Sequence, residues 1–300
     1  MLAARAKSST ISHSTADNND PYIGRFVLQP SLETIREFKI STSSYSAEYG
    51  RSGGAQVNVV TRSGANDLHG SAYEYLRNRV LDARNYFDGA RRPGYVRNQF
   101  GGTLGGPVRQ DRTFFFVNYE ALHERRVFTR LAVDPSAAER AGMLSTTVLD
   151  PFTRQPFPDN RIPASRIHPL AARVLELYDR PVAPQLRDGL HNLIARYDHN
   201  FGARDTLTVR YGWGSQNLLE PSAQETTDVP GFGNYSDNSG HNIAVQHQRV
   251  WSTSVVQTTR LAYNRSSRNS RPFNNDTNVG ALWGVNWLNV APRSYGYPTI

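Results

Sequence analysis

Seven segments of this chain alternate polar and apolar side chains with a period of two residues. In the clearest of them, residues 206–213, four large apolar side chains on one face alternate with two threonines and an arginine on the other. A period of two is that of a β-strand with one apolar and one polar face, so most of the chain is predicted to be all-β. The seven predicted strands are residues 68–77, 96–106, 113–122, 192–199, 206–213, 241–250 and 255–264.

The gaps between these segments alternate between short turns and long polar stretches. The short gaps are residues 108–112, 200–205 and 251–254, and the long ones are residues 80–95, 127–190, 216–239 and 267 onward. An antiparallel meander with short turns at one end, long loops at the other and aromatic residues on its apolar face is typical of outer-membrane β-barrels. In such a barrel the apolar face points outward to lipid and the polar face lines the interior.

A soluble β-sandwich is the alternative, because it also alternates its faces. Sandwich strands are usually shorter, about five or six residues, and their loops are less unequal in length. A sandwich would bury Leu207, Val209, Tyr211 and Trp213 between two sheets, whereas a barrel would leave them on its outer surface. The lengths of strands and loops favour the barrel.

Composition and charge exclude several other classes. The chain has no cysteine, which rules out a disulfide framework, a thiolate metal site and a cysteine nucleophile. No stretch approaches the roughly 18 to 20 apolar residues that a membrane-spanning helix needs, and the first ten residues lack the apolar run of a secretory signal. The net charge is +8, but the arginines are scattered along the chain, so nucleic acid is not an expected partner.

Three motifs follow one another in residues 35–64. They are IREFKI at residues 35–40, YSAEYGRSGG at residues 45–54 and VNVVTRSG at residues 57–64. In this order they resemble the end of the plug domain of TonB-dependent outer-membrane receptors. Four further blocks resemble the Oar-like branch of that family: LHGSAYEYLRN at 68–78, LDARN at 81–85, NQFGGTLGGP at 98–107 and DRTFFF at 111–116. The resemblance runs from about residue 26 to about residue 269.

The resemblance implies a receptor that binds a scarce nutrient at the cell surface and imports it through a plugged barrel of 22 strands. Its expected partners are outer-membrane lipid, the TonB complex if the protein is full length, and an extracellular ligand that the sequence does not identify. The expected location is the outer membrane of a Gram-negative bacterium. Neither a catalytic residue nor a cofactor nor a metal ion is expected, and the ligand-binding residues are unknown.

Seven strands cannot close a barrel of that size, so a partial, open transmembrane barrel with a plug remnant against its concave face is expected. The absence of a signal peptide, of a TonB box and of most of a plug also suggests a fragment. Residues 1–25 are expected to be a disordered terminus, residues 26–64 the C-terminal part of the plug domain, and residues 65–300 the first strands and loops of the barrel. Within the plug part, Ser31 is a candidate start for one helical turn, and residues 55–62 alternate as a strand.

The segment from Gly50 to Gly54 fits the letters of a hydrolase nucleophile elbow, G-x-S-x-G, with Ser52 as the nucleophile. An elbow requires a helix after its serine, whereas the residues that follow Ser52 alternate as a strand. The glycines are better explained by a tight turn that needs positive φ angles.

A second glycine-rich run, residues 101–106, invites comparison with phosphate-binding loops. It lacks the Lys-Ser/Thr pair of a P-loop, and Pro107 with a turn follows where a P-loop has a helix. On a strand that faces the barrel interior, these glycines are expected to let the plug backbone approach closely.

The eight histidines show no HExxH motif and no pair at helical i, i+4 spacing. His241 and His247 share a strand face but lie about 20 Å apart at the usual rise per residue, too far for one ion to bridge. Binding of a metal chelate by loop histidines is left as an alternative to exposed histidines without a role.

The longest loop carries its own pattern. Residues 150–160 and 162–167 are rich in proline, and Pro169 is placed to open a short helix with Leu170, Val174, Leu177 and Tyr178 along one face. A loop of this length with structure of its own is usually functional, so it is a candidate ligand contact.

Two other functions stay open beside nutrient import. One is a surface adhesion or matrix protein that uses the barrel as a scaffold, as in some Oar-like proteins. The other is a soluble carbohydrate-binding β-sandwich, with or without hydrolase activity.

Overall fold

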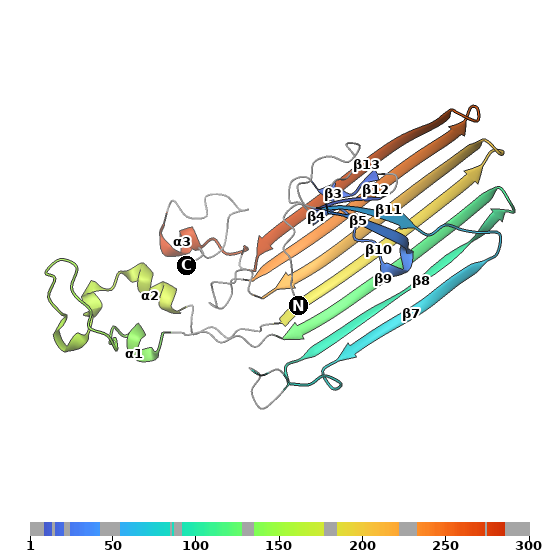
Figure 1. Cartoon of the computed structure of the whole chain (residues 1–300). Coiled ribbons are helices and arrows are strands. Elements are labelled where there is room, and N and C mark those ends of the chain that lie inside the picture. The colour runs from blue at the N-terminus through green and yellow to red at the C-terminus, as the bar shows by residue number, and fades with distance from the viewer. Residues whose placement is uncertain are drawn as a thin grey trace.

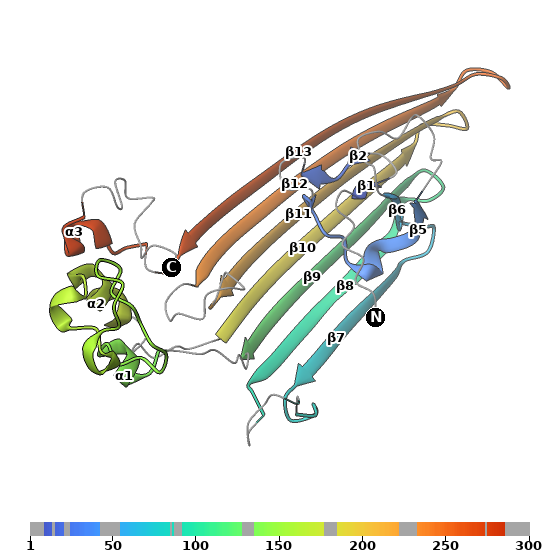
Figure 2. The same cartoon turned by 60° about the vertical axis from the view of Figure 1, so that its left-hand side comes forward.

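The computed structural model of this chain describes residues 9–13, 16–20, 25–42, 55–84, 86, 92–127, 135–176, 185–221, 233–273 and 275–285. Seven long strands form one curved, open sheet, and a small second sheet lies against its concave face (Figures 1 and 2). This arrangement confirms the predicted open antiparallel barrel with a plug remnant.

The large sheet is a simple meander in which each strand pairs antiparallel with the next along the chain. Turns of a few residues join β8 to β9, β10 to β11 and β12 to β13 at one end, and long connections join the other strands at the opposite end. The seven predicted strands are all present, as β7 (His69–Asn78), β8 (Tyr95–Arg109), β9 (Thr113–Val127), β10 (Gln185–Asn200), β11 (Asp205–Glu220), β12 (Asn234–Val250) and β13 (Val256–Pro272).

Strands β8 to β13 are 15 to 17 residues long, longer than the alternation predicted. Most of the extra residues lie at the long-loop end, so the predicted loops 127–190 and 216–239 begin later and end earlier than expected. About 9 to 11 residues suffice to cross a bilayer. Beyond the lipid, backbone pairing continues although neither face has to be apolar, so the strict alternation that marks a strand disappears from the sequence.

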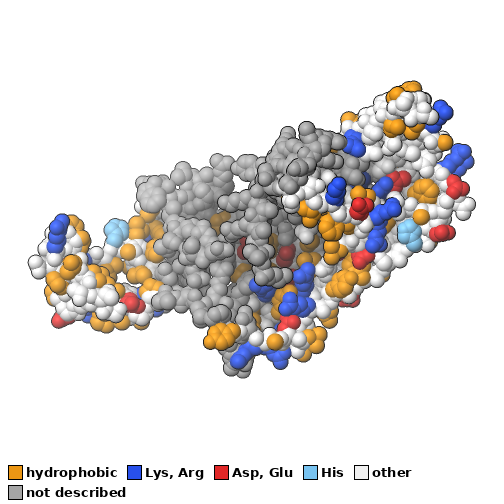
Figure 3. Space-filling view, viewed as in Figure 1, with side chains coloured by type: hydrophobic (Ala, Val, Ile, Leu, Met, Phe, Trp, Pro, Cys, Tyr) orange, Lys and Arg blue, Asp and Glu red, His pale blue; other side chains and the backbone are white. Residues whose placement is uncertain are grey.

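The polar face of the sheet is the buried one. Asn118, Asn192, Arg210 and Asn242 face the plug and are each at most 4% exposed. Leu207, Val209, Tyr211 and Trp213 lie on the opposite face and are all partly exposed, so no second sheet encloses them and the sandwich alternative is excluded for this sheet. On the face that carries the small sheet, basic and acidic side chains stand among apolar ones (Figure 3).

The small sheet has the strand order β2-β1-β6-β5, and a separate pair, β3 with β4, accompanies it. Its helical turn η1 (Leu32–Thr34) follows Ser31, as predicted. The first strand, β1, pairs parallel with β6 and lies inside residues 1–25, where a disordered terminus was expected. The bounds of these strands are β1 (Ser9–His13), β2 (Ala16–Asp17), β3 (Asn19–Asp20), β4 (Arg25–Phe26), β5 (Ile35–Ser41) and β6 (Ala55–Thr61).

Short helices lie beyond the long-loop end of the sheet (Figures 1 and 2). Ser136 opens the first with a capping box, in which its hydroxyl accepts from the Glu139 N–H and the Glu139 carboxylate accepts from the Ser136 N–H. Pro169 opens α2, as predicted, although Leu177 and Tyr178 lie outside the described residues. The helices are α1 (Ala137–Arg140), η2 (Pro158–Asn160), η3 (Ala164–Arg166), α2 (Pro169–Leu175) and, after β13, α3 (Val279–Trp283). In the part of the chain that the structure describes, none of the helices has the length and apolar character needed to cross a membrane.

Candidate ligand site between the plug and the barrel wall

The small sheet meets the wall of the large sheet through residues 27 and 28. Leu28 is buried against Gly212 and Gly214 on β11, where an added Cβ at Gly214 would lie 2.8 Å from Leu28 Cδ1. A Cβ at Gly240 on β12 would collide with the carbonyl oxygen of Val27. Three glycines on adjacent strands therefore form a flat bed, called the glycine bed below, on which this segment rests.

The side chain of Asn18, which is fully buried, makes two hydrogen bonds with the backbone of Leu28. The Asn18 side-chain nitrogen donates to the Leu28 carbonyl oxygen, and the Leu28 N–H donates to Asn18 Oδ1 at 3.1 Å. One amide side chain thus satisfies both backbone groups of the residue that fills the glycine bed, which fixes the position of that residue.

Two more contacts tie the plug part to the wall. Arg196 Nη1 on β10 donates to the Thr61 carbonyl oxygen at 2.9 Å, and the Ser31 hydroxyl donates to Asn118 Oδ1 on β9 at 3.1 Å. Both contacts lie on the concave face, so the predicted seat of the plug remnant is confirmed.

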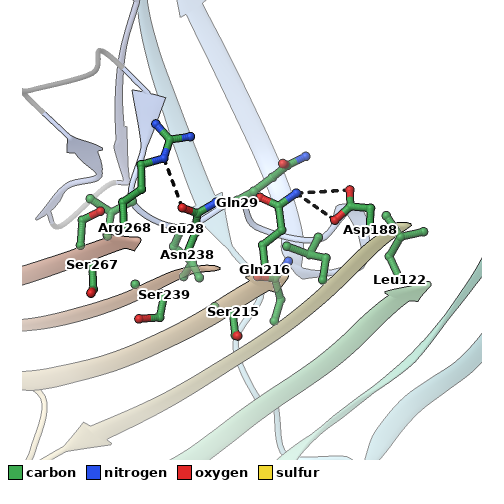
Figure 4. Close-up of a pocket in the computed structure, with 16 residues that line it drawn as sticks. Leu28, Gln29, Leu122, Asp188, Ser215, Gln216, Asn238, Ser239, Ser267 and Arg268 are labelled. Atoms are coloured by element: carbon green, nitrogen blue, oxygen red, sulfur yellow. Dashed lines mark hydrogen bonds between the residues drawn. The ribbon is translucent and has the colours of Figure 1, made fainter. Parts of the chain in front are cut away.

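A cavity of about 530 Å³ opens above the glycine bed, toward the long-loop end (Figure 4). Leu28 and Gln29 contribute from the plug part, Leu122 and Leu190 from β9 and β10, and polar side chains from β10 to β13. A pocket with a few polar groups fixed on strands among apolar ones is the usual form of a small-molecule site.

Four polar side chains run in a hydrogen-bonded row across this cavity wall (Figure 4). Gln216 Nε2 donates to both carboxylate oxygens of Asp188 at 3.0 and 3.2 Å. Asn238 Nδ2 donates to Gln216 Oε1 at 3.5 Å, and Arg268 Nε donates to Asn238 Oδ1 at 3.2 Å. The row, called the amide ladder below, places a carboxylate at one end and an exposed guanidinium at the other, and can hydrogen-bond a polar ligand along its length.

Residues 135–176 form an ordered module beyond the long-loop end. Asn160 Nδ2 donates to the carbonyl oxygens of Leu144 and Thr146, and Arg166 Nη2 donates to Asp150 Oδ1 at 2.7 Å. The N–H of Phe152 and then the Arg166 guanidinium lower the pKa of the Asp150 carboxyl. The loop therefore carries its own structure, as predicted, while ligand contact through it stays a prediction.

The glycines at residues 101–106 were expected to let the plug backbone approach closely. At one end of this run it does, because a Cβ added at Gly64, the last residue of the predicted plug part, would lie 2.7 Å from the Gly106 carbonyl oxygen. Gly101 and Gly105 face the concave side, but Tyr73 lies over Gly101, and His69 and Phe116 lie over Gly105. The adjacent strand β7 supplies two of these rings on the same face, so side chains of the wall lie nearest to Gly101 and Gly105. The glycine bed on β11 and β12 receives the plug backbone and the Leu28 side chain.

The described residues around the other candidate motifs can be compared with what each motif would require. Ser52 lies outside the described residues, but residues 55–61 after it form strand β6, without the helix of a nucleophile elbow. Residues 101–106 lie within β8, without the helix of a phosphate loop. Among the described residues, no three histidine or carboxylate side chains gather as metal ligands, and His241 and His247 lie on the outer face.

Sequence reasoning missed the amide ladder because Gln216, Asn238 and Arg268 fall in stretches that were predicted to be loops. The short turns could have revealed these residues, because a short turn fixes the register of the two strands that it joins. Pairing counted outward from residues 201–204 sets Leu190 opposite Gln216, and pairing across β11 and β12 sets Gln216 opposite Asn238. Extending the register past the apolar band would have placed these side chains on the concave face.

Comparison with known proteins agrees with this architecture. Residues 60–300 match the family described as "Outer membrane beta barrel domain". The chain belongs to that family. It therefore lies in the outer membrane of a Gram-negative bacterium, as predicted.

A curated relative agrees with the resemblance drawn from the motifs. The chain is 33% identical over 120 residues to the TonB-dependent transporter Oar of Myxococcus xanthus, in a match that covers 37% of this chain and 11% of that protein. This barrel protein thus spans about a tenth of the length of the curated relative that it matches.

Two solved receptor structures also match this chain at low identity. The ferric-catecholate import receptor Fiu from E. coli K12 matches with a TM-score of 0.42 and 11% identity, over 87% of this chain and 43% of that one. The siderophore receptor PiuA from Acinetobacter baumannii matches with a TM-score of 0.43 and 9% identity, over 87% of this chain and 38% of that one.

Proposed function

We propose that this chain belongs to a receptor that imports a scarce nutrient across the outer membrane, with energy supplied through the TonB complex. The observation that carries the proposal is the seat of residues 27 and 28 on the glycine bed, directly below a polar cavity that faces the long-loop end. A plug segment that closes the floor of a surface-facing cavity is what gated import requires. The resemblance to a TonB-dependent transporter supports the same conclusion.

In this proposal residues 26–64 are the C-terminal part of the plug, and residues 65–300 are barrel strands and loops. The connections after β9 and β11 face the outside and first capture the nutrient, and the amide ladder then holds it above Leu28. Passage requires residues 27 and 28 to leave the glycine bed. No residue acts as a catalyst, because the cavity only has to bind and release.

A disulfide between plug and wall tests this proposal in the whole receptor. The chain contains no cysteine, so Leu28→Cys with Gly214→Cys introduces one pair whose side chains are in contact. Oxidation should stop nutrient uptake by cells, and reduction should restore it. The control pair, Leu28→Cys with Gly202→Cys in the short turn, should leave uptake unchanged under both conditions.

Uptake that continues with the pair fully cross-linked would contradict gated import at this seat. Surface adhesion is the second candidate, because Phe152, Leu149 and Met143 leave 83%, 52% and 47% of their surfaces exposed on the module beyond the sheet. A gene deletion that abolishes surface attachment without a growth defect on any scarce nutrient would favour adhesion over import.

A further inference from the structure

Two arginines stand directly opposite each other on the lipid-facing side of the barrel wall. Arg125 of β9 is the register partner of Arg187 of β10, and both are exposed. Each lies six residues from an outward apolar residue of its own strand, Tyr119 or Leu193, so by alternation both point outward. Side chains directly opposite in an antiparallel pair lie about 5 Å apart, and like charges there repel.

The pair lies just beyond a girdle of aromatic and imidazole rings. His123 is 6.0 Å from the Phe100 ring and 5.4 Å from the His191 ring between centroids, and the Tyr119 hydroxyl is 2.8 Å from His191 Nδ1. Amphipathic rings gather where lipid tails meet headgroups. Arg125 follows His123 by two residues, toward the long-loop end, so the pair lies at the level of the headgroups.

Nothing acidic neighbours the pair on this face, among the residues that the structure describes. Val96 of β8 and Leu219 of β11 flank it in the same row, and His123 and Gly189 precede it. Arg187 donates to Gln185 Oε1 at 3.1 and 3.3 Å, and that amide carries no charge. The acidic side chains nearest in sequence, Glu124 and Asp188, point to the opposite face.

We infer that Arg125 and Arg187 form a binding site for the phosphate headgroup of a membrane lipid. Guanidinium groups bind phosphate oxygens in a planar, bidentate geometry, and one phosphate between the two arginines relieves their repulsion. A free phosphate ion has the same chemistry, but the site opens sideways into the lipid layer, next to rings that pack on lipid. The occupant is therefore a lipid. It is bound specifically through its headgroup, unlike the lipids that surround every barrel without a defined site.

The test uses the full-length protein in bilayer discs of neutral phosphatidylcholine with a minor fraction of either lipid A or phosphatidylglycerol. The measured quantity is the amount of anionic lipid that stays with each protein after extraction. Arg125→Gln with Arg187→Gln should lower this retention by roughly ten-fold or more, since each basic residue near a charged lipid surface strengthens the attraction to anionic lipid. The control variant, Arg112→Gln in a short turn at the opposite end, should retain as much as the unchanged protein.

A second variant separates binding from folding. Arg125→Glu replaces the repelling pair by an attracting one, so it should unfold at the same or a higher temperature and yet lose the bound lipid. Retention equal to the unchanged protein in either variant would overturn the inference. So would displacement of the lipid by an equal concentration of inorganic phosphate, which would identify a site for the free ion.

Discussion

The guanidinium of Arg196 on the barrel wall donates to the carbonyl oxygen of Thr61, the last residue of plug strand β6, at 2.9 Å. Asp198 holds the same guanidinium through two bonds of 2.8 and 3.0 Å, and Thr208 donates to Asp198 at 2.7 Å. The wall thus positions one arginine to hold the end of the plug strand.

Arg196→Met removes the hydrogen bond to Thr61, so this end of β6 should open more often. A hydrogen bond from a charged group to a partly buried acceptor contributes about 1.5 to 3 kcal/mol, so the Arg62 amide and its neighbours should exchange hydrogen at least ten-fold faster. Hydrogen exchange measured by mass spectrometry checks this, with Arg249→Met on the outer face as the control. Equal protection in both variants would show that Arg196 does not hold the plug strand.

Two alanine substitutions in the glycine bed should differ in their effects. At Gly214 the new Cβ meets the end of the Leu28 side chain, which can rotate, whereas at Gly240 it meets the backbone of Val27, which cannot. Gly240→Ala should therefore cost about 1 to 3 kcal/mol, and Gly214→Ala less. Cleavage by a protease near Val27 should be faster in the variant that displaces residues 27 and 28 more from the glycine bed. Gly202→Ala, with nothing within 4 Å, is the control, and the reverse order of sensitivity would contradict the seat described here.

The module beyond the sheet should lose its order only in acid. Because the pKa of Asp150 is lowered in the folded module, mainly by the Phe152 N–H, its contribution to stability is fully present above the ordinary value of 3.8. That contribution disappears as the pH falls through the lowered pKa. Limited proteolysis of residues 135–176 across pH should show opening below about pH 4. Asp150→Asn should open more readily at neutral pH, and an opening midpoint above pH 5 would contradict this role of Asp150.

A substitution in the amide ladder should weaken nutrient affinity and leave the folding of the barrel unchanged. Gln216→Leu removes the bridge between Asp188 and Asn238, so the nutrient concentration at half-maximal uptake should rise about ten-fold while maximal uptake is unchanged. Asn217→Leu, whose side chain points to the other face, should change neither quantity. An unaltered half-maximal concentration in Gln216→Leu would remove the ladder from the ligand path.

The sequence predicted the meander because lipid imposes an apolar face on each strand, as from Leu207 to Trp213, and because short turns stay short. It could not predict where strands end at the long-loop side, since residues such as Gln216 and Asn238 lie beyond the lipid, where nothing imposes an apolar face on the strand. Nor could it predict which glycines receive the plug. Gly101 and Gly240 look alike in sequence, and only the side chains on the neighbouring strand distinguish them.

Single labels along β11 test the central claim most directly. Cysteines placed one at a time at Thr208, Val209, Arg210 and Tyr211 of the full-length protein, with no other cysteine present, can each carry a fluorophore. A quencher dissolved in the lipid should reach the labels at residues 209 and 211 and not those at residues 208 and 210. Equal quenching at all four positions, or quenching at the even positions alone, would contradict an outer apolar face in lipid and a polar face around the plug.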